Sequence, residues 1–321
     1  MDFSMSISNT VSKGTAAEEM SFFQAYLEDE ASRLADGIKH ETISNEKIQR
    51  GNIVLNTYQV TSDAIHGGMG SVWRVHHKIW DVDLAMKRPQ PKFFAEGSGR
   101  RKEEFIEECQ HWIDLGLHPN VVTCYYVRDI GGVPTIFSEW MDGGSLKDRI
   151  LEGSLYEGTE SEIQGRILDI AIQTARGLRY SHDSGLVHQD IKPGNILVSK
   201  EWDAKIADFG LAKAQKKLED EDDVRKAGNE TPATGHKSTG FTLAYCPAEQ
   251  AAGAIAEPWM DVYAWAITVL EMFAGRRQWA SGAEVTKEAE KCFAESRIFV
   301  PEELRQLLRE CLQGGASLQK N

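Results

Sequence analysis

The chain has 321 residues, of which 41% are hydrophobic, and this is enough apolar material to bury a sizeable core in one or two domains. Its formal net charge of −13 argues against a protein built mainly to neutralise nucleic-acid phosphates. The longest apolar run, from Val262 to Phe273, is interrupted by Glu271 and is too short to span a bilayer, and the first residues lack the apolar core of a signal peptide. We therefore expect a cytoplasmic protein with no nucleic-acid partner and no membrane partner.

The five cysteines form no Cys-x-x-Cys pair and have no matching histidine spacing, so neither a zinc site nor a disulfide framework is predicted. We expect reduced, mostly structural thiols at these positions: Cys109, Cys124, Cys246, Cys292 and Cys311.

Residues 1–52 form a polar extension with few aliphatic side chains. Within it, Thr15 and Glu18 have capping-box spacing, and Phe23, Tyr26 and Leu34 follow at helical intervals. The pattern predicts one amphipathic helix plus a flexible segment. Two roles remain open for this helix: it packs on the domain behind it, or it is a regulatory or dimerising extension.

After Asn52 the pattern changes to short apolar strands, at Ile53–Val60, Trp73–Val75 and Val82–Lys87, which predict a β-meander. A glycine cluster lies between the strands, formed by Gly67, Gly68 and Gly70. Such a cluster is often only a hairpin turn. Glycines also let a backbone approach phosphates closely, and the position ahead of Lys87 favours a loop that covers a nucleotide, with Lys87 on its α- and β-phosphates.

Further along, a run of polar residues has the composition of a phosphoryl-transfer site. The carboxylate of Asp190, which can accept a hydroxyl proton, is followed closely by Lys192 and the amide of Asn195. A second carboxylate, Asp208, comes after an apolar strand-like run. Phosphoryl transfer requires positioning and neutralisation of charge, and Asn195 and Asp208 are able to hold magnesium on nucleotide phosphates. The set predicts chemistry that uses ATP and Mg²⁺.

The Val187–Leu197 segment and Asp208-Phe209-Gly210 resemble the catalytic and metal-binding loops of the eukaryotic-type protein kinase superfamily, and the glycine segment resembles that of bacterial Ser/Thr kinases. The resemblance implies an α+β, bilobal fold. A small β-rich N-lobe with one main helix would cover residues 53–141, and a larger, mostly helical C-lobe would cover 142–312. Residues 313–321 would be a tail and a possible truncation point.

The resemblance also implies roles for the nucleotide-binding residues. Lys87 would be oriented by a helix glutamate, Glu108, with Glu107 as the competing choice. The hinge residues Glu139 and Met141 would bind adenine through their backbone, with Ser138 guarding the pocket. Three apolar side chains would sandwich the base, although each is equally compatible with ordinary core packing: Val72, Ala85 and Leu197.

The acceptor is implied in the same way. Lys192, two residues after Asp190, would contact the γ-phosphate, and Thr242 falls where Ser/Thr kinases keep a threonine below the acceptor hydroxyl. The expected partner is therefore a protein substrate with a Ser or Thr acceptor. Asp261 would begin the central buried helix as a structural acid that holds the catalytic-loop backbone.

The chain departs from the family pattern at three positions, of which Gln189 concerns regulation. Ile65 stands where the first loop glycine would fall, and Gln189 stands where an arginine often precedes the catalytic aspartate. Without that guanidinium, a phosphate on the activation segment loses its bidentate partner, so this non-RD loop predicts weaker dependence on loop phosphorylation. Glu249 of Pro247-Ala248-Glu249 lacks a clear arginine partner. Candidate autophosphorylation sites are Thr231, Thr234, Ser238 and Thr239.

Two other functions remain open. A pseudokinase scaffold would bind nucleotide and partners without turnover, and Ile65 and Gln189 would be early signs of that drift. A small-molecule kinase of the aminoglycoside or choline type shares His-x-Asp and Asn but usually lacks the set formed by Lys192, Thr242 and Glu249.

Overall fold

The computed structural model describes residues 48–314 except 68–69, 95–98, 210 and 212–241. The chain divides into two compact units, and each is described by itself. The first contains the residues up to Lys102 together with Thr123–Trp140, and the second contains Glu103–Val122 and the residues from Met141 onward. The predicted amphipathic helix of residues 1–52 lies almost entirely outside the described residues.

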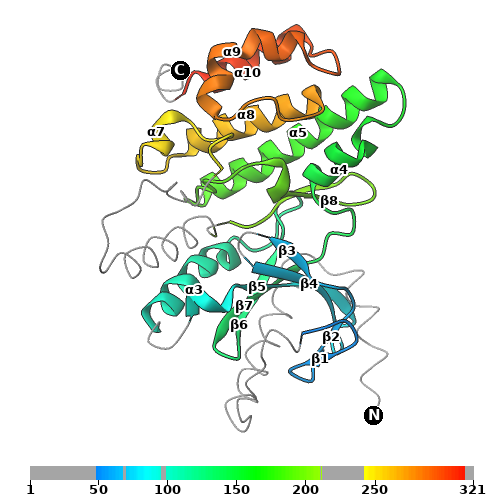
Figure 1. The fold of residues 1–321 in the computed structure, drawn as a ribbon, viewed down its shortest axis with the longest axis vertical. Coiled ribbons are helices and arrows are strands. Elements are labelled where there is room, and N and C mark those ends of the chain that lie inside the picture. Colours follow the sequence, from blue (N-terminus) through cyan, green and yellow to red (C-terminus); the bar gives the residue numbers. More distant parts are fainter. Residues whose placement is uncertain (1–47, 68–69, 95–98, 210, 212–241, 315–321) are drawn as a thin grey trace. The chain divides into compact units, whose positions relative to one another are not determined.

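The first unit is built on one antiparallel sheet with the strand order β1-β2-β4-β5-β7-β6, and β3 pairs with β4 beside this path (Figure 1). A short 3₁₀ helix, η2 (Pro91–Phe94), follows β5. The strands are β1 (Ile53–Val54), β2 (Tyr58–Val60), β3 (Ile65–Gly67), β4 (Gly70–His77), β5 (Val82–Pro89), β6 (Cys124–Ile130) and β7 (Val133–Glu139).

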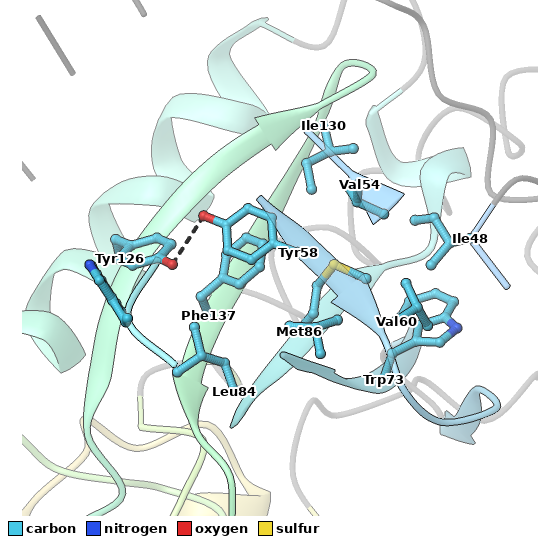
Figure 2. Close-up of a cluster of buried hydrophobic side chains, with 12 residues drawn as sticks. Ile48, Val54, Tyr58, Val60, Trp73, Leu84, Met86, Tyr126, Ile130 and Phe137 are labelled. Atoms are coloured by element: carbon cyan, nitrogen blue, oxygen red, sulfur yellow. Dashed lines mark hydrogen bonds between the residues drawn. The ribbon is translucent and has the colours of Figure 1, made fainter. Parts of the chain in front are cut away.

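The core of this unit lies on one face of the sheet, because side chains alternate between the faces along β4 and β5. Trp73 and Met86 lie opposite each other in the ladder and are buried on this face. Figure 2 shows how the aromatic rings pack there: Tyr58 stacks on Phe137 with ring centroids 4.3 Å apart. The hydroxyls of Tyr58 and Tyr126 are 3.0 Å apart, so these buried polar ends satisfy each other.

The sequence predicted a single strand from Ile53 to Val60, and this was wrong. The segment forms two strands, β1 and β2, which pair with each other. Leu55 and Asn56, between them, have φ values of 49° and 55°. This left-handed pair reverses the chain in a tight hairpin, and an apolar residue such as Leu55 gives little sequence signal for such a turn.

The second unit is mainly helical, with one small hairpin (Figure 1). Helix α3 begins in the first unit, but most of its residues belong to the second. The helices are α3 (Gly99–Asp114), α4 (Leu146–Glu152), η3 (Ser154–Tyr156), α5 (Glu160–Asp183), η4 (Pro193–Asn195), α7 (Ala248–Ala251), α8 (Pro258–Ala274), α9 (Gly282–Ala294) and α10 (Glu302–Leu312), and the hairpin strands are β8 (Ile196–Val198) and β9 (Ala204–Ile206).

Two capping boxes fix where helices of this unit begin. Ser145 caps α4 together with Asp148, and Thr159 caps α5 together with Glu162. In each box the hydroxyl accepts a hydrogen bond from the N3 backbone N–H, and the acidic side chain accepts one from the cap residue's own N–H.

Helix α8 forms the centre of the second unit, since nearly all of its residues from Met260 onward are buried. It packs against α5, where the indole N–H of Trp265 lies 3.1 Å from both the carbonyl oxygen of Ala171 and the hydroxyl of Thr174. Gly177 on α5 permits another close approach, because a Cβ there would lie 2.5 Å from the carbonyl oxygen of Asn120. The long buried helices therefore hold the loops at their ends in fixed positions.

The expected α+β composition, with a β-rich part and a larger helical part, is confirmed. The domain boundaries at residues 52, 141 and 312 stay predictions. Among the described helices, none combines the length and the apolar character needed to cross a membrane. All five cysteines are buried free thiols.

Candidate phosphoryl-transfer site

Asp190 lies at the centre of a closed hydrogen-bond network in the second unit. The Nζ of Lys192 and the Nδ2 of Asn195 both donate to Oδ2 of Asp190, the latter at 3.0 Å. The backbone N–H and the hydroxyl of Thr242 donate to Oδ1 at 3.1 and 3.2 Å. Lys192 also donates to the Thr242 hydroxyl at 2.9 Å. Four residues that the sequence places up to 52 positions apart are thus brought together around one carboxylate.

Asp261 binds the backbone of the loop that precedes Asp190, as the sequence predicted. Its side chain is 1% exposed, and it accepts hydrogen bonds from the backbone N–H groups of His188 and Gln189, each at 2.7 Å. His182 on α5 contacts the same carboxylate at 2.9 Å. Since hydrogen bonds to a buried carboxylate are strong, Asp261 connects α8 rigidly to the loop.

His188 fixes the other side of the loop. The ring is fully buried, its Nε2 lies 2.8 Å from the carbonyl oxygen of Ala207, and its Nδ1 accepts a hydrogen bond from the Asp190 N–H at 3.2 Å. The ring also packs edge-on against Phe209 with centroids 4.7 Å apart. Because Ala207 immediately precedes Asp208, this histidine connects the segments that carry Asp190 and Asp208.

The two proposed metal ligands lie at the same open end of the β8–β9 hairpin, where Ile196 pairs with Ile206. Asn195 directly precedes β8, and Asp208 follows two residues after β9. The Ala207 N–H donates to the Asn195 carbonyl at 2.9 Å, which closes the hairpin beside both residues. The Asn195 amide nitrogen is used by Asp190, so its oxygen is the atom suited to a cation. Asp208 has a φ of 68°, a conformation that non-glycine residues adopt mainly where the surroundings enforce it.

The segment that carries Thr242 is anchored to α8 through Tyr245. The Tyr245 N–H donates to the Thr242 carbonyl at 2.9 Å, and its hydroxyl donates to Oε2 of buried Glu271 at 2.5 Å. Burial raises the pKa of Glu271, and burial together with the nearby Glu271 charge raises the pKa of Tyr245. Tyr245 therefore stays protonated and acts as a hydrogen-bond donor.

In the first unit, the residues expected around the nucleotide share the face of the sheet opposite the core. Val72 lies opposite Lys87, and Ala85 lies opposite Ser138, in the ladders that join β4, β5 and β7. Directly opposed residues of an antiparallel pair project to the same face. Val72, Ala85 and Lys87 are all half-buried, unlike the fully buried Met86 between them. The structure thus brings these four predicted residues together.

Two glycines of the cluster are described: Gly67 ends β3 and pairs with Gly70, the first residue of β4. Gly70 is required by the fold itself, since its φ is 153° and a Cβ there would lie 2.1 Å from the Arg88 carbonyl oxygen. No atom lies within 4 Å of a Cβ added at Gly67. Gly68 lies outside the described residues. Ile65 is 59% exposed on β3, so its β-branched side chain fills no core position.

The choice between the two helix glutamates is informed by their burial. On α3 Glu108 is 5% exposed, whereas Glu107 is exposed to solvent. His111 approaches the Glu108 carboxylate at 3.9 Å. Because a buried carboxylate requires compensating partners, Glu108 has the character of a paired residue and Glu107 that of a surface residue.

The predicted hinge lies where the two units adjoin in sequence. Glu139 ends β7, and it binds Thr123 twice: its N–H donates to the Thr123 carbonyl at 2.9 Å, and its carboxylate accepts from the Thr123 N–H at 3.3 Å. Met141 is buried in the second unit, and Leu197 on β8 is half-buried there. The two glutamate contacts fix the end of β7 within the first unit.

The structure shows the surroundings of Gln189 and Glu249, two residues at which the chain departs from the family pattern. Gln189 has a φ of 71°, and its carbonyl accepts a hydrogen bond from Gln250 at 2.7 Å. The Glu249 side chain is exposed, and it makes no ion pair among the residues that the structure describes. The candidate phosphorylation sites Thr231, Thr234, Ser238 and Thr239 lie outside the described residues.

Comparison with known families matches residues 58–317 to the protein kinase domain. The chain belongs to the protein kinase domain family.

Curated relatives of this kinase domain include bacterial Ser/Thr kinases. It is 33% identical over 230 residues to the serine/threonine-protein kinase drp72 of Corynebacterium efficiens, covering 69% of this chain and 39% of that protein. It is 31% identical to PknA of Corynebacterium glutamicum and 28% identical to PrkC of Bacillus subtilis, covering 69% and 70% of this chain. The matches cover 44% of PknA and 32% of PrkC, so the chain spans less than half the length of these relatives.

Sequence reasoning missed three residues that organise the site of this kinase domain: His188, Gln250 and Glu271. His188 was seen only as part of a motif, while Glu271 appeared as an interruption of an apolar run. A charged residue within an otherwise apolar helix is the signal that could have found Glu271, because burial of a carboxylate requires a specific partner. Gln250 has no comparable signal in the sequence.

Proposed function

We propose that this kinase domain transfers the γ-phosphate of ATP to Ser or Thr hydroxyls of a protein. The observation that carries the proposal is the network in which Lys192, Asn195 and Thr242 all donate to the Asp190 carboxylate. A carboxylate held by four donor groups from three residues keeps one orientation, and orientation of the acceptor hydroxyl is a main requirement of phosphoryl transfer.

Asp190 then orients the acceptor hydroxyl and takes its proton. Lys192 contributes positive charge beside this carboxylate, where negative charge on the transferred phosphoryl group requires neutralisation. Thr242 lies between the two, since its hydroxyl accepts from Lys192 and donates to Asp190. These contacts support an acceptor that is a small aliphatic hydroxyl presented next to Thr242.

The side chains present fit a magnesium ion. The Asn195 amide oxygen and the Asp208 carboxylate are hard oxygen ligands, which Mg²⁺ prefers, and the Asn195 orientation is set by the two hydrogen bonds that its nitrogen donates to Asp190. When bound, the ion neutralises phosphate charge and orients the nucleotide phosphates. Lys87 and Glu108 have the proposed task of fixing the α- and β-phosphates, and Gly67, Gly68 and Gly70 are proposed to bind the phosphates through their backbone.

The adenine ring is proposed to bind the backbone of Glu139 and Met141, between Val72 and Ala85 on one side and Leu197 on the other. The shared sheet face of Val72, Ala85 and Lys87 supports this assignment, because one face then offers an apolar platform followed by a cation. Gln189 in place of an arginine supports a non-RD loop whose activity depends little on loop phosphorylation. A cytoplasmic location remains part of the proposal.

The test is transfer of labelled phosphate from ATP with magnesium to the chain itself and to a generic basic protein, followed by identification of the phosphorylated residue. Asp190→Asn and Lys87→Ala should each abolish transfer to Ser and Thr. Matched controls are Asp169→Asn, an exposed acid on α5, and Lys287→Ala, an exposed lysine on α9, which should keep the parent rate. Transfer that persists in Asp190→Asn would contradict the proposal, and ATP binding without any transfer would favour the pseudokinase scaffold.

A further inference from the structure

A pocket of about 360 Å³ lies within the second unit, and none of its lining residues belongs to the phosphoryl-transfer site. One side is the segment after α8, from Arg276 to Trp279, and the other side is formed by α9 and its C-cap residue. The lining residues on this second side run from Glu284 to Cys292 on α9, which has a non-helical backbone at Glu288, and include the C-cap residue Glu295. A pocket of this size suits a small molecule.

The two sides of the pocket carry opposite charge. Arg276 and Arg277 lie on the segment after α8. On the other side, Glu284 and Glu288 lie on α9 and Glu295 is its C-cap residue. Among the described ion pairs, none joins either arginine to any of these glutamates. Charges of opposite sign that face one space without pairing are complementary to a ligand that carries both charges.

Some of the acidic charge is already engaged within the protein. Lys291 approaches the Glu288 carboxylate at 3.0 Å, and Glu284 accepts a hydrogen bond from the Ala280 N–H at 2.9 Å. Glu295 makes no ion pair among the described residues, and its negative charge, after that of Glu288, helps to raise the pKa of Lys291. The pocket thus offers a cation-binding carboxylate opposite two guanidinium groups.

Three of the remaining lining side chains are apolar and buried. Trp279, Val285 and Cys292 are 5%, 0% and 8% exposed. Burial raises the pKa of the Cys292 thiol, which therefore stays uncharged. The indole nitrogen of Trp279 is buried and has no hydrogen-bond partner, a costly state that a ligand oxygen or a bound water would relieve.

We propose that this pocket binds a free α-amino acid with an apolar side chain. The ligand carboxylate pairs with Arg276 and Arg277, whose planar guanidinium groups match a carboxylate. The ligand ammonium group faces Glu295 and Glu288. Its apolar side chain packs against Trp279, Val285 and Cys292, which explains why a pocket with charged walls has an uncharged base.

The experiment measures binding to the full chain with L-leucine as the ligand, by NMR of ¹⁵N-labelled tryptophan side chains. The chain has eight tryptophans, and the Trp279 signal is assigned by its loss in Trp279→Phe. L-leucine should shift this signal in a saturable manner. Two analogues that each lack one charge, 4-methylpentanoate and 3-methylbutylamine, should bind at least about tenfold more weakly, as expected when one charge-assisted contact of about 1.5–3 kcal/mol is lost.

Arg276→Glu and Glu295→Lys should also weaken leucine binding by about tenfold or more, for the same reason. Lys287→Glu changes a charge on α9 outside the pocket lining and should leave binding unchanged. Thermal melts of each variant show that the fold is retained. The proposal is overturned if L-leucine gives no saturable shift, if 4-methylpentanoate binds equally well, or if folded Arg276→Glu binds leucine as the parent does. Because no turnover is measured, these outcomes are independent of the proposed kinase activity.

Discussion

The hydroxyl and the backbone N–H of Thr242 both donate to Oδ1 of Asp190, at 3.2 and 3.1 Å. The other carboxylate oxygen accepts from Lys192 and Asn195. An ionised carboxylate offers about four acceptor positions, so this carboxylate is fully occupied. An acceptor hydroxyl can therefore bind Asp190 only by replacing a donor, and Thr242 is the donor that belongs to a separate segment of the chain.

Replacing Thr242 should separate the two roles of its side chain. Thr242→Ser keeps the hydroxyl and should retain most of the phosphotransfer rate. Thr242→Val has nearly the same shape but removes the bridge between Lys192 and Asp190, so we expect kcat to fall by about 10²-fold, the low end of a general-base contribution. Steady-state kinetics with ATP and protein substrate, together with thermal melts, make the comparison. Equal kcat in both variants would show that the hydroxyl bridge has no catalytic role.

Asp261→Asn should destabilise the second unit. The substitution removes the charge that accepts hydrogen bonds from His188 and Gln189 in a site that is 1% exposed. A hydrogen bond to a buried charged group contributes about 1.5–3 kcal/mol, so we expect a loss of about 2–4 kcal/mol in the free energy of unfolding. Urea denaturation measures it. Asp183→Asn is the control, since that acid is 71% exposed in a surface pair with Arg179 and should change stability by less than about 1 kcal/mol.

His77 should make the stability of the first unit sensitive to acid. Burial, reinforced by the charge of Arg128, lowers the pKa of His77 from 6.5 to about 4. The unfolded chain then binds a proton more readily than the folded chain between about pH 6.5 and 4. Stability is therefore full above pH 6.5 and is lost as the pH falls through this window, by up to about 3 kcal/mol.

The measurement is urea denaturation at several pH values, with His77→Gln compared with the parent. Glutamine keeps an acceptor for the Trp80 N–H, which donates to the His77 ring at 3.1 Å, but it does not titrate. The variant should be less stable at neutral pH yet show a flatter dependence on pH. His66→Gln, at an exposed position on β3, should leave the slope unchanged. A slope that is identical in His77→Gln and the parent would assign the acid sensitivity to other groups.

The two described loop glycines should respond differently to alanine. Gly70→Ala places a Cβ against the Arg88 carbonyl at a φ of 153°, so we expect a loss of about 1–3 kcal/mol in stability. Gly67→Ala meets no neighbouring atom and should change stability by less than about 0.5 kcal/mol. If Gly67 approaches the phosphates, its substitution should still weaken ATP binding. Calorimetric titration with ATP decides this, and unchanged affinity in Gly67→Ala would leave the cluster as a hairpin turn alone.

Much of the site could be predicted because phosphoryl transfer uses polar residues at short, fixed spacings. Asp190, Lys192 and Asn195 lie within six positions of one another, so the chain itself keeps them close. Asp261 was predicted as a buried acid only through the family resemblance, and its hydrogen bonds confirm this role. The shared face of Val72, Ala85 and Lys87 follows from strand alternation once the register is known.

Other features depend on tertiary packing, which local sequence does not encode. His77 lies in a strand with no signal that its ring is fully buried between Tyr58 and Trp80. The turn at Leu55 and Asn56 needs left-handed backbone without a glycine. The charged side chains that line the pocket beside α9 are ordinary surface residues in the sequence, and only the fold brings Arg276 and Arg277 to the same pocket as the glutamates.

The spacing of the two proposed metal ligands depends on the number of residues in the short β8–β9 ladder. Ile196 pairs with Ile206 and Val198 pairs with Ala204, and Asn195 and Asp208 extend from this ladder on opposite strands. Inserting or deleting a single residue within either strand would shift the pairing by one position and turn its side chains to the other face. The distance between the two oxygen ligands is thus set by the length of a three-residue ladder. An insertion or deletion in this ladder would separate Asn195 and Asp208 even though neither residue is substituted.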